Sequence, residues 1–137
     1  MSTSARTPAS RPLRAALATG LLALALGISC ISPTIPIPPP EPSAMTFTDV
    51  DPVAGVASFS YEPQATYAGA VVYVFNRDQG EGVITTADPD DGSVAPTRPF
   101  PAVEEDEIVV TFEVDGQLAT TCVRLRAGPS DASRRCN

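Results

Sequence analysis

The chain has 137 residues, of which nine are basic and sixteen acidic, for a net charge of −7. It contains no histidine, which excludes Ser-His-Asp and Cys-His catalysis and histidine-ligated metal centres. An acidic surface repels phosphates and argues against nucleic-acid binding. No carboxylate spacing indicates an acid–base pair, so we expect a protein that is not an enzyme and needs no cofactor.

The beginning of the chain has the order of a bacterial export signal. Three arginines precede the apolar run 15–28, which is shorter than the roughly 20 residues of a transmembrane helix. Gly27 and Ser29 are small and stand three and one positions before Cys30, as signal peptidase cleavage requires. The pattern predicts a signal peptide over residues 1–29.

The segment Leu26-Gly27-Ile28-Ser29-Cys30 resembles the lipobox of bacterial lipoproteins, with its leucine one position earlier than that family prefers. The resemblance implies cleavage before Cys30 and attachment of acyl chains such as palmitate to this residue. Ile31 follows the cysteine, where the family carries Asp for inner-membrane retention, and this favours the outer membrane. An ordinary secretory signal and an uncleaved anchor stay open as alternatives.

Cleavage leaves a mature chain of 108 residues. Three of the nine basic residues lie in the signal, so six remain against sixteen acidic residues, a net charge of −10. Residues 31–44 contain six prolines and are expected to be extended polyproline II, because proline is excluded from helices and sheet interiors. We expect residues 30–44 to form a lipidation site followed by a stalk, whose length is roughly 40 Å. A β-domain is expected over residues 45–137.

Short β-type runs divided by turn residues follow in chain order. Strands are expected at 46–50 (an edge strand), 56–61, 70–75 (central, because both its faces are apolar), 83–87, 107–114 and 117–126. Residues 94–102 are expected to be irregular because three prolines interrupt them. The spacing predicts an all-β fold, an immunoglobulin-like or transthyretin-like β-sandwich of about six or seven strands.

The last two strands permit a register prediction. Asp115-Gly116 lies between two alternating runs and indicates a two-residue hairpin. Pairing across this turn places Phe112 opposite Ala119, on an apolar face directed at the core. Glu107 then faces Arg124 on the other side, as an opposite-charge cross-strand pair.

Two further cysteines, Cys122 and Cys136, remain if Cys30 is lipidated. Thiols in an oxidising compartment usually pair. We expect a disulfide that fixes the C-terminal tail to the last strand, after a turn at Gly128-Pro129. Two free or intermolecular thiols are the alternative.

A wider resemblance covers residues 69–126. Gly69-Ala70-Val71-Val72-Tyr73-Val74, Gly82-Val83-Ile84-Thr85-Thr86-Ala87-Asp88, Asp91-Gly92-Ser93 and Ile108-Val109-Val110 resemble bacterial immunoglobulin-like and carboxypeptidase-regulatory-like β-domains. The chain departs from that pattern after Ser93, where Val94-Ala95-Pro96-Thr97 replaces a strand. The resemblance implies a noncatalytic accessory or adhesive module.

Three local features have alternative interpretations. Asp88, Asp90 and Asp91 are a weak calcium candidate, because calcium prefers several oxygen ligands, although such a turn is more often simply solvated. The acidic run 104–107 either binds a cationic partner, chelates a metal together with the Asp88 turn, or is a solvated loop that discourages edge-to-edge pairing. Tyr61 and Tyr67 flank a loop and form either a recognition patch or the end of the core.

The sequence thus predicts an envelope lipoprotein that displays a β-domain as a structural or interaction module. Expected partners are the membrane, through a lipid anchor, and an envelope protein or glycan, but no nucleic acid. A tethered accessory subunit of a secretion or envelope-assembly machine is the second reading, and a secreted, unlipidated protein is the third.

Overall fold

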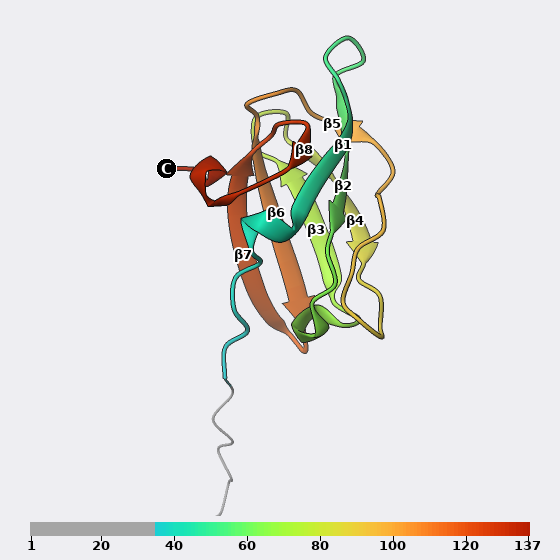
Figure 1. The fold of residues 1–137 in the computed structure, drawn as a ribbon, viewed down its shortest axis with the longest axis vertical. Helices are drawn as coiled ribbons and strands as arrows, with labels where there is room; N and C mark the ends of the chain where they lie inside the picture. Colours follow the sequence, from blue (N-terminus) through green and yellow to red (C-terminus); the bar gives the residue numbers. More distant parts are fainter. Residues whose placement is uncertain (1–34) are drawn as a thin grey trace, which may run out of the picture. The chain divides into compact units, whose positions relative to one another are not determined.

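The computed structural model describes residues 35–137. The predicted signal peptide and Cys30 lie outside these residues. The compact unit, Pro36–Asn137, contains two four-stranded antiparallel sheets, so the predicted all-β sandwich is confirmed (Figure 1). Within the described residues, no helix has both the length and the apolar character needed to cross a membrane.

The elements follow one another as η1 (Pro42–Ala44), β1 (Met45–Asp51), β2 (Val56–Tyr61), η2 (Ala65–Tyr67), β3 (Val71–Asn76), β4 (Glu81–Thr86), β5 (Phe100–Pro101), β6 (Glu107–Val114), β7 (Gln117–Arg124), β8 (Gly128–Pro129) and η3 (Ala132–Arg134), where η marks a 3-10 helix.

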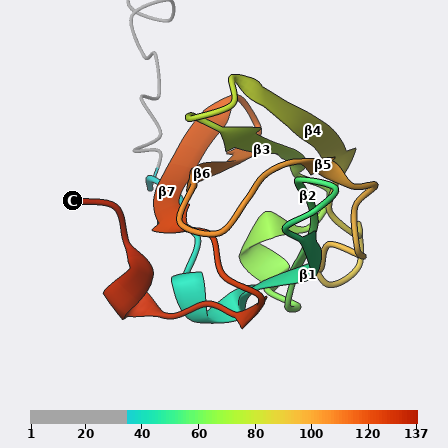
Figure 2. The same ribbon diagram turned by 90° about the horizontal axis from the view of Figure 1, so that it is seen from above.

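The two sheets have the strand orders β5-β2-β1-β8 and β4-β3-β6-β7, and they lie as two layers in Figure 2. Two of the eight strands were not among the six predicted segments. These are β5 and β8, which are two residues long and lie in segments where proline or glycine gives no strand signal. The prediction of β1 as an edge strand is wrong, because Gly128 and Pro129 return to pair with Phe47 and Thr46.

The β6–β7 hairpin has the predicted register along its full length, from Val114 opposite Gln117 to Glu107 opposite Arg124. Asp115 and Gly116 both have positive φ angles, of 49° and 77°, as the tight turn of a hairpin requires. The face predicted to be apolar is buried and includes Phe112.

The core lies between the two sheets and is rich in aromatic side chains. Phe47 and Phe59 enter it from the first sheet and Phe112 from the second, and all three are almost fully buried. Tyr67, on η2, closes one end of the core with its ring 4.4 Å from that of Phe112, centroid to centroid. Such aromatic contacts add stability beyond the burial of apolar area.

Strand β3 is central in its sheet, between β4 and β6, as predicted. Val72 and Val74 point into the core, whereas Val71 and Phe75 on the opposite face are 36% and 44% exposed. The strand is therefore apolar on both faces although only one face is covered.

Candidate functional site

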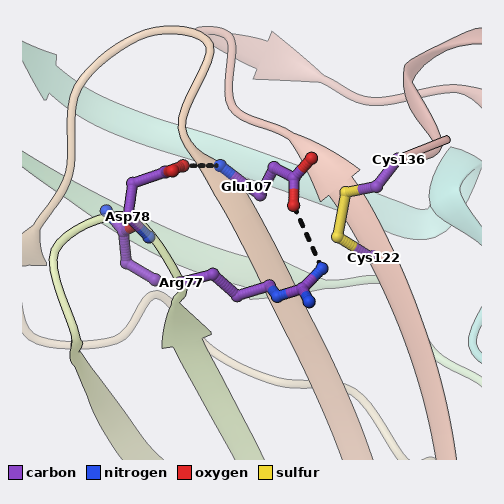
Figure 3. Close-up of a disulfide and its surroundings, with 6 residues drawn as sticks. Arg77, Asp78, Glu107, Cys122 and Cys136 are labelled. Carbon is purple, nitrogen blue, oxygen red and sulfur yellow. Dashed lines mark hydrogen bonds and ion pairs between the residues drawn. A yellow bond between two sulfur atoms is a disulfide. The ribbon is translucent and has the colours of Figure 1, made fainter.

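The C-terminal tail is fixed to β7 by the predicted disulfide. Cys122 and Cys136 are bonded to each other, with their Cα atoms 5.4 Å apart (Figure 3). The backbone reinforces the link, because Cys136 N donates to Cys122 O at 3.1 Å and Arg135 forms a β-bridge with Val123. The tail therefore continues the sheet beyond β7 and covers its edge.

Glu107 lies beside this disulfide, and an acidic oxygen and both sulfur atoms fall within 4.8 Å of one another. This is the one potential metal-ligating group of three among residues 35–137, but oxidised sulfurs supply no thiolates. The carboxylate of Glu107 instead forms an ion pair with Arg77, at 3.0 Å, as Figure 3 shows. Arg124 is directly opposite Glu107 in the ladder, as predicted. The ion pair of Glu107 is nevertheless formed with Arg77, the residue that follows β3.

The proline-rich segment is anchored to the domain over its second half. The hydroxyl of Tyr67 donates to Pro38 O at 2.7 Å, and the hydroxyl of Thr121 donates to Pro40 O at 2.7 Å. Polyproline carbonyls have no internal hydrogen-bond partners, so these side chains satisfy them. The compact unit consequently begins at Pro36, ahead of the Met45 boundary that composition suggested.

Tyr61 and Tyr67 belong to the core and do not form an exposed recognition patch, because both rings are buried. Tyr61 Oη accepts a hydrogen bond from Glu41 N at 3.1 Å. Burial, which disfavours the phenolate, raises the pKa of both hydroxyls above the usual tyrosine value. The proline segment therefore docks on the hydroxyl groups of these two tyrosines.

The three residues of the calcium candidate are exposed, and the carboxylates of two of them stabilise the local turn. Asp88 Oδ1 accepts from Asp90 N, and Asp91 Oδ1 accepts from Ser93 N, each at 2.8 Å. The second bond lowers the pKa of Asp91. Gly92 has a φ of +76° and lies so close to the backbone of Gln64 that a side chain there has no room, so the turn is packed against the η2 loop.

The acidic run before β6 is not simply a solvated loop, because Asp106 is buried. Its Oδ2 accepts from Asn76 Nδ2 at 2.7 Å and from Val103 N at 3.0 Å. Asn76 is fully buried as well and also donates to Pro101 O at 3.0 Å. This pair joins the end of β3 to β5 and to the start of β6.

Two exposed apolar side chains distinguish the outer face of the second sheet near β4. Phe75 is 44% and Ile84 66% exposed, and the register places Phe75 opposite Gly82. A shallow hollow of about 380 Å³ lies here, and Gly82 has to be a glycine because a side chain would collide with the backbone of Val74 and Phe75. The hollow is lined by Tyr73, Val74, Phe75, Gly82, Val83 and Ile84.

The sequence interpretation missed both the Asn76–Asp106 pair and this exposed apolar area. An asparagine at a strand end and an acid in an acidic run look like ordinary solvated residues. The sequence did contain a sign of the exposed apolar area, because residues 70–75 are apolar on both faces. The same pattern, however, is typical of a strand that is covered on both sides. Only the arrangement of layers distinguishes the two cases.

No protein-family model, no curated protein and no solved structure matches this chain. The candidate functional features are therefore those of the chain itself: an N-terminal segment docked on Tyr67 and Thr121, a tail clamped by the Cys122–Cys136 disulfide, and an exposed apolar area on β3 and β4.

Proposed function

We propose that this protein is a noncatalytic envelope lipoprotein, held in the membrane by acyl chains on Cys30, whose β-sandwich serves as an interaction or structural module. The anchoring part of the proposal comes from the lipobox-like segment. The docked proline segment bears on the geometry of the anchor, because its hydrogen bonds at Pro38 and Pro40 shorten the free part of the linker.

Pro38 is the first residue of the proline segment that forms a hydrogen bond to the domain among those described. Eight residue steps separate it from Cys30, and an extended chain of that length reaches at most about 28 Å. The proposed anchor thus keeps the domain nearer to the membrane than a free stalk over residues 30–44 does.

The negative charge of the mature chain bears on how the protein is held at the membrane. The mature chain carries a net charge of −10, so it is repelled by anionic headgroups within a Debye length of about 8 Å. The lipid therefore supplies the membrane affinity, and the domain surface stays free for another partner. Acyl chains provide stable anchoring when two or more are present.

A noncatalytic role is consistent with how the polar groups are used. The carboxylate of Asp106 forms a buried hydrogen bond with Asn76, that of Glu107 forms an ion pair, and that of Asp88 accepts a hydrogen bond within a turn. The chain has no histidine to supply a general base near neutral pH.

The test is mass analysis of the mature N-terminus, combined with fractionation of a Cys30→Ser variant. We expect the wild-type chain to begin at Cys30 with acyl chains attached and to sediment with membranes, and the variant to be soluble. A variant that still fractionates with membranes contradicts lipid anchoring, and a mature chain starting at an unmodified Cys30 favours ordinary secretion.

A further inference from the structure

The four edges of the two sheets are protected unequally. In the first sheet, β5 and β8 are edge strands of only two residues each. In the second sheet, the edge of β7 is covered by the C-terminal tail through the bridge between Val123 and Arg135. Short or covered edges are the usual protection against pairing with another chain.

Strand β4 lacks these protections. It is six residues long, contains neither proline nor lysine, and has β3 as its one partner in the ladder (Figure 2). No hydrogen bond outside the β3 ladder involves its residues within the part of the chain described here. Strand β5 of the other sheet lies close to β4 but does not pair with it, so the outward backbone groups of β4 have no hydrogen-bond partner among the described residues.

The register identifies which backbone groups these are. Ala87 N donates to Ala70 O at 2.8 Å, and hydrogen-bonded positions alternate along an antiparallel ladder. Thr85 and Val83 therefore bond to β3, whereas the N–H and C=O groups of Ile84 and Thr86 point outward. The side chains of the same two residues are exposed, and that of Ile84 lines the hollow.

Charge determines which occupant fits. The segment from Asp78 to Ser93 contains five acidic residues and no basic residue, with Glu81 at one end of β4 and Asp88 just beyond the other. Antiparallel pairing of two β4 strands brings Glu81 of one copy toward Thr86 and Asp88 of the second copy, so like charges meet. A second copy is disfavoured, and a basic segment is favoured.

We propose that the free edge of β4 binds an extended segment of a partner protein by strand addition, in which apolar side chains cover Phe75 and Ile84 and basic residues at the segment's ends face Glu81 and the Asp88 turn. Main-chain hydrogen bonds supply affinity in this mode, and alternate side chains supply specificity. The inference rests on the proposed function as an interaction module and names its surface and partner class.

The test uses the full-length chain purified in mild detergent. The probe is a fluorescent peptide long enough to span β4, with alternating valine and threonine and an arginine at each end; a second peptide carries glutamate at both ends. We expect saturable binding of the arginine peptide by fluorescence anisotropy, weakened by added salt. The glutamate peptide is expected to bind at least about tenfold more weakly, a difference of about 1.4 kcal/mol.

Two variants locate the site. Thr86→Pro removes an outward N–H without breaking a bond to β3 and is expected to weaken binding at least about tenfold, since proline is tolerated on a strand edge. Ile84→Thr removes an exposed apolar side chain and is expected to weaken binding several-fold. Its matched control is Leu118→Thr, because Leu118 is 67% exposed on the same sheet but at its far side, and this change is expected to leave binding unaltered.

Circular dichroism melting establishes that each variant is folded before binding is compared. Equal affinity of wild type and Thr86→Pro overturns the proposal, as does equal binding of the two peptides or the absence of saturable binding. A wild-type dimer in sedimentation that Thr86→Pro converts to a monomer also overturns it, by showing a second copy on the edge. Membrane fractionation of the same proteins reports on the Cys30 anchor separately, so failure of the anchor and failure of the edge are distinguishable.

Discussion

The buried pair Asn76–Asp106 offers the sharpest test of what holds this sandwich together. Asn76 Nδ2 donates to Asp106 and Pro101, while its Oδ1 accepts from Asp78 N at 2.9 Å and Gln79 N at 3.2 Å. Asn76→Ala removes all four hydrogen bonds and leaves a buried carboxylate short of one donor.

The magnitude follows from these contacts. A hydrogen bond to a charged group is worth about 1.5–3 kcal/mol and a neutral one about 1 kcal/mol. Water entering the vacated space restores part of this loss. We therefore expect the free energy of unfolding of Asn76→Ala to fall by about 3–5 kcal/mol, measured by urea denaturation followed by circular dichroism with the disulfide intact.

Asn76→Asp adds a pH signature to the same site. The side chain keeps its shape, but a second carboxylate then faces Asp106, so in the variant the pair holds one proton with an apparent pKa above that of an unpaired carboxyl. A raised carboxyl pKa stabilises the fold at low pH, and this stability is lost as the pH increases past the unfolded value, about 3.9. We expect the Asn76→Asp protein to lose stability between about pH 4 and pH 7 relative to wild type.

The neighbouring residue provides the matched control. Arg77 forms an ion pair with Glu107 in which the two side chains are 57% and 27% exposed. Arg77→Ala is expected to cost at most about 1 kcal/mol, as for surface ion pairs in general. A cost of Asn76→Ala no larger than this control, or an Asn76→Asp protein whose stability relative to wild type does not vary with pH, refutes the assignment of the pair as a structural link.

Three further predictions concern other parts of the fold. Replacing both Cys122 and Cys136 with serine should lower the free energy of unfolding by about 3 kcal/mol, seen in urea denaturation; mass mapping that finds Cys122 free in the exported protein contradicts the bridge. Gly92→Ala should destabilise by more than about 2 kcal/mol, because it combines a positive φ with a backbone clash, whereas Gly80→Ala, at a φ of +71° in open space, should cost only about 1 kcal/mol, for the left-handed backbone alone; equal melting-temperature shifts would falsify the role of close packing. Because burial raises the pKa of Tyr67, the folded state holds that proton longer, and stability should fall by up to about 1.4 kcal/mol per pH unit above about pH 10. Tyr67→Phe should reduce this alkaline slope, to which the buried Tyr61 also contributes, and an unchanged slope in base titrations speaks against burial of the Tyr67 hydroxyl.

Much of the local structure was determined by the sequence alone. The β6–β7 hairpin follows from Asp115-Gly116, since two adjacent residues with positive φ suit few other turns, and alternation indicated which side of these two strands faces the core. The pairing of Cys122 with Cys136 followed from an even number of remaining cysteines and a turn between them. These features depend on interactions between residues close in the chain, so a linear pattern carries them.

Only the tertiary structure decided the rest. The strand orders, the return of Gly128–Pro129 beside β1 and the docking of Pro38 on Tyr67 join segments far apart in sequence. The burial of Asp106 and the exposure of Ile84 depend on which surfaces those segments cover. Local propensity and periodicity report how a residue sits on its own strand, but they do not report what lies above that strand or beside it. The free edge of β4 is consequently a property of the assembled sheets and has no signature in the sequence of the strand itself.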